Sequence, residues 1–316
     1  MKMIFKIIIS LGLLFLLWLK IDWQGLNAIL ASARFTYIFL SFIALLFAWF
    51  LNSRKWQLLL KILGLNRPLV YLFKLNLISF FYSLVLPGGQ LTGEVLKCFH
   101  LAKNEKEKPL LILSVLFDRL TGFLAYAILG FLAVIFSVLS PRLKISFLCL
   151  FGAIIASVVI ACFVFLHPRL HHWLQKILMT STLGRKINSY LLAIKEKSVL
   201  NYSVFRVAMV AFLSLLFQLV VSFYVYFAAK ALGVEIAITE IIWIFSLVSV
   251  ILVLPITYAG LGLRESSFVY LLSLFNIAGA VAFSLSLLVL FVGVLVAAFG
   301  GFWLLIRGVG SPQIKN

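Results

Sequence analysis

Long apolar runs recur along this chain, and each is long enough to cross a membrane. A helix rises about 1.5 Å per residue, so roughly 20 apolar residues span the hydrocarbon core of a bilayer. Such runs lie near residues 3–19, 35–52, 119–139, 145–166, 205–229 and 279–306. In lipid the backbone must satisfy its own hydrogen bonds, which a helix does within one segment. The sequence therefore predicts an all-α, polytopic membrane bundle with about six full spans.

The composition agrees with this class and excludes others. Hydrophobic residues make up 64% of the 316 residues and charged residues 11%, which leaves too little polar surface for a soluble globule. The net charge of +18 comes from short segments between apolar runs and not from a basic, aromatic-rich domain. We therefore expect membrane lipids as partners and no nucleic acid. The cysteines and histidines lack metal-site spacing, and no catalytic or cofactor motif appears, so we expect neither metal nor cofactor.

Two further apolar regions, 69–118 and 238–276, are interrupted by helix breakers that are followed by charge. The first break reads Leu86-Pro87-Gly88-Gly89 and continues to Gly93 and Glu94; the second begins at Leu254-Pro255 and passes Tyr258, Gly260 and Gly262 to reach Arg264 and Glu265. Proline removes a backbone donor and glycine permits positive φ. Broken backbone at membrane depth persists only where it is buried in protein or lines a wet cavity. Both regions are therefore predicted to be re-entrant and to contribute to a binding site.

The basic residues predict an orientation. If each broken region enters and leaves on one side, 20 of the 27 Lys and Arg residues fall on the side of both termini and five on the other, while Arg119 and Arg264 stay near or within the membrane. Basic residues favour the cytoplasmic side. We therefore expect residues 1–316 to form one domain of the cytoplasmic (inner) membrane, with cytoplasmic N- and C-termini. The sequence does not indicate an oligomeric state.

Two features of the organisation stay open. Segment 167–204 is too polar to span; Ile187, Leu191 and Ile194 favour an amphipathic connector on the cytoplasmic leaflet, but a solvated linker has the same composition. The two broken segments would enter from opposite sides, which is typical of an inverted repeat around one site. Chance recurrence of leucine, proline and glycine is the alternative, and the two breaks differ in length.

Charges within the apolar regions are the best site candidates. Six of the nine acidic residues are assigned to loops: Asp22, Glu105, Glu107, Glu196, Glu235 and Glu240. The other three are Glu94, Asp118, which precedes Arg119, and Glu265, which follows Arg264. A charge at the bilayer centre costs about 2.5–3.5 kcal/mol and is retained where it pairs or meets water.

Adjacent residues of a helix do not face each other, so we expect each arginine to pair with a carboxylate elsewhere, for instance Arg264 with Glu94. As alternatives, Asp118-Arg119 could mark the end of a span, and Arg264-Glu265 could anchor a helix at the interface.

These residue types suit a lipid head group. The planar fork of arginine matches phosphate, glycine-rich turns at helix starts offer free N–H groups to an anion, and carboxylates bind an amine or carry a proton. The predicted substrate-binding set is Gly88, Gly89, Gly93, Glu94, Asp118, Arg119, Tyr258, Gly260, Gly262, Arg264 and Glu265.

Three motifs, taken together, resemble a known family. They are Leu86-Pro87-Gly88-Gly89 with Gly93-Glu94-Val95-Leu96-Lys97, Phe117-Asp118-Arg119-Leu120-Thr121-Gly122, and Pro255 through Gly260-Leu261-Gly262-Leu263-Arg264-Glu265. In this order, over nearly the whole chain, they resemble the lysylphosphatidylglycerol synthase transmembrane family, a flippase-like domain.

The resemblance implies movement of a phospholipid or lipid-linked head group across the membrane. The soluble aminoacyl-transferase domain of full-length synthases is not recognised in the sequence, so a separate lipid-modifying enzyme is a further expected partner. A membrane-embedded head-group transferase and a non-catalytic accessory protein of cell-envelope lipid or glycolipid synthesis stay open as alternatives.

Overall fold

The computed structural model describes residue 29 and residues 32–86, 90–102, 108–166, 204–253, 257 and 260–307. In these ranges the chain is helical and contains no strand. The helices are α3 (Phe35–Ile62), α4 (Leu69–Val85), α5 (Gln90–Leu101), α6 (Lys108–Phe136), α7 (Pro141–Leu166), α10 (Val204–Ala231), α11 (Ile238–Val253), α12 (Leu263–Ser273) and α13 (Gly279–Arg307). The predicted span 3–19 and the predicted connector lie outside the described residues, except for Val204.

The all-α membrane class is confirmed. Among the described helices, α3, α6, α7, α10 and α13 are long and apolar enough to cross a bilayer. Large apolar side chains are exposed on their outer faces, for example Phe35, Phe136, Phe205 and Leu305. Such faces would be costly in water, but hydrocarbon solvates them well. The helices thus present an apolar outer surface to lipid.

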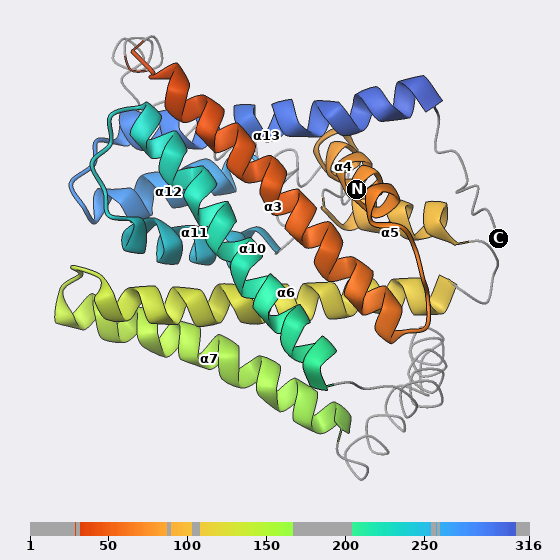
Figure 1. Ribbon diagram of the computed structural model, residues 1–316. Helices are drawn as coiled ribbons and strands as arrows, with labels where there is room; N and C mark the ends of the chain where they lie inside the picture. Colours follow the sequence, from red (N-terminus) through yellow and green to blue (C-terminus); the bar gives the residue numbers. More distant parts are fainter. Residues whose placement is uncertain are drawn as a thin grey trace.

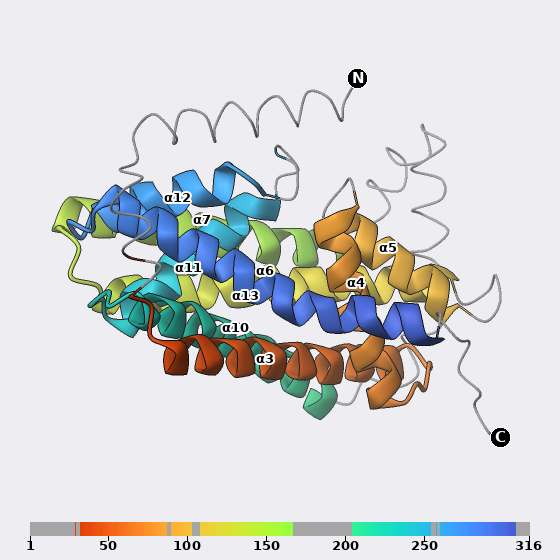
Figure 2. The same ribbon diagram turned by 90° about the horizontal axis from the view of Figure 1, so that it is seen from above.

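Helices α3 and α10 form an antiparallel pair that crosses the front of the bundle in Figure 1 and lies along one face of it in Figure 2. The N–H of Arg34, just before α3, donates to the carbonyl of Ala231 at the end of α10 over 2.8 Å. Further along, Ser41 Oγ donates to the Tyr224 carbonyl over 2.9 Å. Figure 1 shows α13 along one side of this pair and α6 with α7 along the other. The α3–α10 pair therefore contacts both α13 and α6.

Each break joins two short helices that pack together. Helix α4 packs against α5, and α11 packs against α12; the α4–α5 unit and the α11–α12 unit lie toward opposite ends of the bundle in both views (Figures 1 and 2). Gly93 allows the first pair to approach closely, because a Cβ at this position would lie 2.2 Å from the Ser79 carbonyl oxygen. Short, broken helices in both predicted regions match the expectation from proline and glycine.

Among the helices that the structure describes, the first four and the last four are two copies of one unit. Helices α3, α4, α5 and α6 have 28, 17, 12 and 29 residues, and α10, α11, α12 and α13 have 28, 16, 11 and 29. One constant offset relates Phe35 to Val204 and Ile62 to Ala231. After the break, a second constant offset relates Lys108 to Gly279 and Phe136 to Arg307. The difference in offset arises in the breaks, whose unequal lengths had obscured the repeat in the sequence.

Local contacts repeat at the offset that relates α3 to α10. Gly64 and Gly233 end α3 and α10 with φ of 78° and 70°, a left-handed conformation that favours glycine. Their N–H groups donate to the carbonyls of Lys61 and Lys230, both over 3.1 Å. Packing between the copies is also exchanged: α6 packs on α11, and α13 packs on α4. Because α3 and α10 are antiparallel, the two units are inverted relative to each other, as the first of the open interpretations proposed.

Helix α6 begins earlier than the sequence predicted. It starts at Lys108 and not at 119, so region 69–118 contains the α4–α5 pair and also the first third of α6. Pro109 is compatible with this start because the first turn of a helix needs no N–H donor there. Asp118 and Arg119 consequently lie inside a continuous helix and not at its end.

Candidate functional site

The first predicted charges form an ion pair between α5 and α6. Arg119 Nε donates to Glu94 Oε2 over 2.5 Å, and the two side chains are 18% and 20% exposed. Arg119 thus pairs with a carboxylate that is distant in sequence and not with the adjacent Asp118, as predicted. The partial exposure leaves this pair within reach of solvent or a ligand.

Asp118 pairs with Lys55, one of the basic residues that the predicted orientation assigns to the cytoplasmic side. Lys55 Nζ of α3 lies 2.9 Å from Asp118 Oδ1, and the side chains are 2% and 10% exposed. The ammonium also reaches the Asp118 carbonyl, 3.4 Å away, and the ring of Phe217, whose centroid is 5.7 Å away. A buried pair of this kind compensates two charges that would each be costly alone.

A second buried lysine lies beside this pair. Lys97 of α5 is 3% exposed; its ammonium is 3.2 Å from Asn76 Oδ1 and 4.3 Å from the centroid of the Trp56 ring. Asn76 donates to Ser53 Oγ, and Trp56 donates to Ser114 Oγ, each over 2.9 Å. These contacts connect α3, α4, α5 and α6. We call Lys55, Glu94, Lys97, Asp118 and Arg119 the first charge cluster.

The second predicted pair differs from the expectation. Arg264 does not reach a distant carboxylate: its Nη2 lies 2.5 Å from Oε1 of the adjacent Glu265. The rule that neighbours do not face each other fails here because both residues lie in the first turn of α12, where Glu265 folds back to accept the Gly262 N–H over 2.6 Å. Ser286 of α13 donates to the same carboxylate over 3.4 Å. Glu265 is 1% exposed and Arg264 is 11% exposed, so the pair lies within the bundle.

The predicted glycines have backbone roles where the structure describes them. Gly260 and Gly262 have φ of 79° and 82°, which allows the turn that starts α12. Gly93 permits the close approach of α4 and α5 described above. Gly88, Gly89 and Tyr258 lie outside the described residues.

The inverted repeat relates the two sites. The offset that relates α6 to α13 also relates Glu94 to Glu265, so each unit carries a glutamate just after its break. The contact between Lys55 and Asp118 has a neutral counterpart, in which the Tyr224 hydroxyl donates to the Val289 carbonyl. The two units therefore share a geometry, while the first carries more charge.

Two buried polar atoms near these residues have no hydrogen-bond partner among the described residues. They are Nη2 of Arg119 and Oε1 of Gln218, the residue next to Phe217 on α10. The Gln218 amide nitrogen donates to Ser246 Oγ over 3.3 Å, in agreement with its expected interhelical role. A buried polar group without a partner is costly, and such groups are commonly satisfied by water or a ligand.

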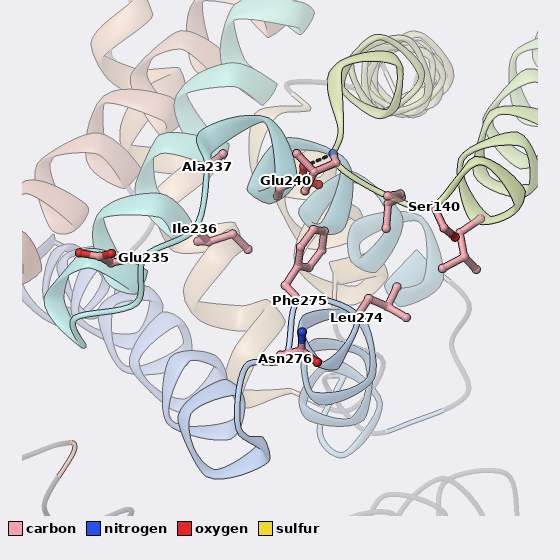
Figure 3. A pocket seen from close by; sticks show the side chains of 11 residues that line it. Ser140, Glu235, Ile236, Ala237, Glu240, Leu274, Phe275 and Asn276 are labelled. Carbon is pink, nitrogen blue, oxygen red and sulfur yellow. Dashed lines mark hydrogen bonds between the residues drawn. The ribbon is translucent and has the colours of Figure 1, made fainter.

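One cavity of about 490 Å³ lies at the end of the bundle where α6 meets α7, α10 meets α11 and α12 meets α13 (Figure 3). None of the predicted site residues lines it. Glu240 does, and its assignment to a loop was wrong: it is 2% exposed in the first turn of α11. Its carboxylate accepts Ser137 Oγ over 2.7 Å and the Val138 N–H over 2.9 Å, which joins the α6–α7 loop to the helix start (Figure 3). Together with the favourable helix dipole, these donors explain the burial of Glu240.

Four buried charges were not among the predicted site residues: Lys55, Arg67, Lys97 and Glu240. Lys97 follows Glu94 by three residues, which places both on one helix face, and that spacing could have indicated it. Lys55 precedes Trp56 in a helix that continues an apolar run, which is a weaker signal. Glu240 gave no signal, because its burial depends on a loop from another helix.

An all-α, multi-pass membrane protein built from two inverted units, each with a broken helix pair and a buried ion pair, belongs to a class in which function depends on polar groups held within the membrane. The family model described as "Lysylphosphatidylglycerol synthase TM region" matches residues 3–301. The chain therefore belongs to this family, as its motifs indicated, and is a membrane protein of the lipid head-group modification and flippase type. A comparison with curated proteins gave no match.

Proposed function

We propose that this protein moves a phospholipid or lipid-linked head group from one leaflet of the membrane to the other. The observation that supports this proposal is the occurrence of one ion pair beside a broken helix in each of two inverted units: the part-buried Glu94 with Arg119, and the buried Glu265 with Arg264. Retaining charges at these positions is costly unless they meet a polar partner. The family membership supports a lipid substrate.

In this proposal the ion pairs exchange partners during transport. A head group that carries phosphate competes with Glu94 for the arginine fork of Arg119, and an amine competes with the arginine for the carboxylate. In the second unit, Arg264 and Glu265 offer the same two groups. Because the units are inverted, equivalent sites in the two units would face opposite sides of the membrane. Alternate exposure of the two sites would then carry a head group across without placing it in hydrocarbon.

We further propose that the protein resides in the cytoplasmic membrane with both termini in the cytoplasm. The support is the excess of basic residues on the side of the termini. In this orientation the loop between α3 and α4 faces the cytoplasm, and the loop between α10 and α11 faces the opposite side.

A vesicle assay tests the transport proposal. Purified protein is reconstituted in liposomes that contain a trace of phospholipid with a fluorescent head-group label, and dithionite is added to reduce the outer-leaflet label. Transport-competent protein makes more than half of the label accessible over time. We expect Glu94→Gln, Arg119→Gln and Arg264→Gln each to slow this second phase about tenfold or more, because each leaves a buried charge without its partner.

Arg142→Gln is the matched control, because Arg142 is exposed at the start of α7. Size-exclusion profiles and thermal stability show whether each variant is folded. A wild-type protein that transports no labelled lipid, or three charge variants that transport at the wild-type rate, would contradict the proposal.

A further inference from the structure

The first charge cluster holds one positive charge more than its carboxylates can balance. Lys55, Lys97 and Arg119 are three cations, and Glu94 and Asp118 are two anions. Asp118 pairs with Lys55 and Glu94 pairs with Arg119. Among the residues that the structure describes, no carboxylate lies within ion-pair distance of Lys97. The excess charge is therefore located at Lys97.

The surroundings of Lys97 stabilise a cation but do not neutralise it. Among the described residues, the ammonium contacts the amide oxygen of Asn76 and the face of the Trp56 ring, and the side chain is 3% exposed. Both contacts favour the charged form of the lysine. A buried charge without a counter-ion is unfavourable, so this position is suited to an anion that is not part of the described chain.

A second and independent observation indicates an anion here. Nη2 of Arg119 is buried and has no hydrogen-bond partner within the described ranges, while Nε of the same guanidinium holds Glu94. Glu94 and Lys97 lie on one face of α5, since they are three residues apart in the helix. Both cations are thus neighbours of one carboxylate: Arg119 is the ion-pair partner of Glu94, and Lys97 follows Glu94 by three residues on the same helix face. The partial exposure of Glu94 and Arg119 provides the approach for a ligand.

The second unit lacks this excess. Arg264 and Glu265 balance each other, and the counterpart of the Lys55–Asp118 pair is the neutral contact between Tyr224 and Val289. We propose that the first charge cluster binds the phosphodiester of a lipid with a net anionic head group. The groups that would contact the phosphodiester are the Lys97 ammonium and Nη2 of the Arg119 guanidinium. This inference rests on the proposed function and narrows its substrate: one uncompensated positive charge selects a monoanionic head group over a zwitterionic or cationic one.

Binding of short-chain lipids to the detergent-solubilised protein, measured by native mass spectrometry, tests this proposal. The probes are dihexanoyl lipids with four head groups: phosphatidylglycerol, phosphatidylcholine, lysylphosphatidylglycerol and diacylglycerol, which has no phosphate. For the wild type we expect phosphatidylglycerol to bind about tenfold more tightly than phosphatidylcholine, and lysylphosphatidylglycerol more weakly still. Lys97→Met should reduce the preference for phosphatidylglycerol to less than about threefold, Lys97→Arg should retain it, and diacylglycerol binding should not change.

Lys61→Met is the matched control, because Lys61 is exposed near the end of α3 and should leave the preference intact. An unchanged preference in folded Lys97→Met, or equal binding of all head groups by the wild type, would overturn the proposal. The wild-type order of affinities decides the question even if Lys97→Met does not fold. Inorganic phosphate as a competitor separates the two sources of the anion: displacement of the lipid only at concentrations far above that of the lipid supports a head-group site, and displacement at equal concentration overturns it in favour of a free-phosphate site.

The outcome is separable from that of the transport assay. Head-group selectivity without movement of labelled lipid would contradict the proposed function and support the anion site. Movement of lipid by both wild type and Lys97→Met, with no head-group preference in either, would keep the function and reject this site.

Discussion

Lys55 and Asp118 stabilise the junction of α3 and α6 only as a pair. Removing one partner leaves the other charge buried, which typically costs about 3–5 kcal/mol. We therefore expect Lys55→Met and Asp118→Leu each to lower the free energy of unfolding strongly. The double variant Lys55→Met/Asp118→Leu should recover much of the loss, because the second unit makes the equivalent contact with neutral groups. Unfolding in detergent with increasing SDS measures all three variants.

Lys144→Met, at the start of α7, is the control for loss of a lysine that has no carboxylate partner among the described residues. A double variant as unstable as the sum of the two single variants would show that the charges act independently and would contradict this interpretation.

At the same scale, the sequence predicted which residues carry charge into the membrane better than it predicted their partners. Glu94, Arg119, Arg264 and Glu265 were identifiable because each follows a break or interrupts an apolar run. Partners depend on how helices pack, and packing is not visible in local spacing. Arg119 pairs across two helices, whereas Arg264 pairs with its neighbour because the helix start lets Glu265 turn back.

At the scale of elements, close backbone contact sets the position of the broken helices. A Cβ at Gly93 would lie 2.2 Å from the Ser79 carbonyl oxygen, and one at Gly300 would lie 2.1 Å from that of Leu77. We expect Gly93→Ala and Gly300→Ala each to destabilise the protein by about 1–3 kcal/mol, because α4 must move away from α5 or from α13. The same SDS titration measures the change.

Gly122→Ala is the matched control, because a Cβ at Gly122 would have no atom within 4 Å. Alanine is the better helix former by about 1 kcal/mol, so this variant should be neutral or stabilising. Equal losses for all three alanine variants would show that close approach is not the cause.

The sequence predicted the type of each described helix and the location of both breaks, but not where α6 begins. The break signals are local, since proline and glycine act on their own backbone. The start of α6 was hidden because the apolar residues after Pro109 were too few to span by themselves, and their continuity with the following run depended on accepting Asp118 and Arg119 inside one helix. A search for uninterrupted apolar runs overlooks a long helix that contains charged residues of buried ion pairs.

At the scale of the whole molecule, the repeat places equivalent loops at opposite ends of the bundle. Asn66 and Glu235 are counterparts at the constant offset, and both are exposed. In a background with Cys98, Cys149 and Cys162 replaced by serine, we expect Asn66→Cys to react with a membrane-impermeant maleimide only from the cytoplasmic side and Glu235→Cys only from the other side. Labelling of intact and opened cells measures the two accessibilities.

Labelling of both cysteines from one side would contradict the inverted arrangement in the membrane. Labelling from opposite sides, but with Asn66→Cys outside, would retain the repeat and reverse the proposed orientation.

The two constant offsets in residue number between the four-helix units also bear on the origin of the chain. Tandem duplication of a half-length gene leaves such offsets, and one additional span between the copies, which α7 can supply, inverts the second copy in the membrane. Each half is then free to diverge, and the surplus cation in one half beside a neutral counterpart in the other is the kind of asymmetry that duplication permits.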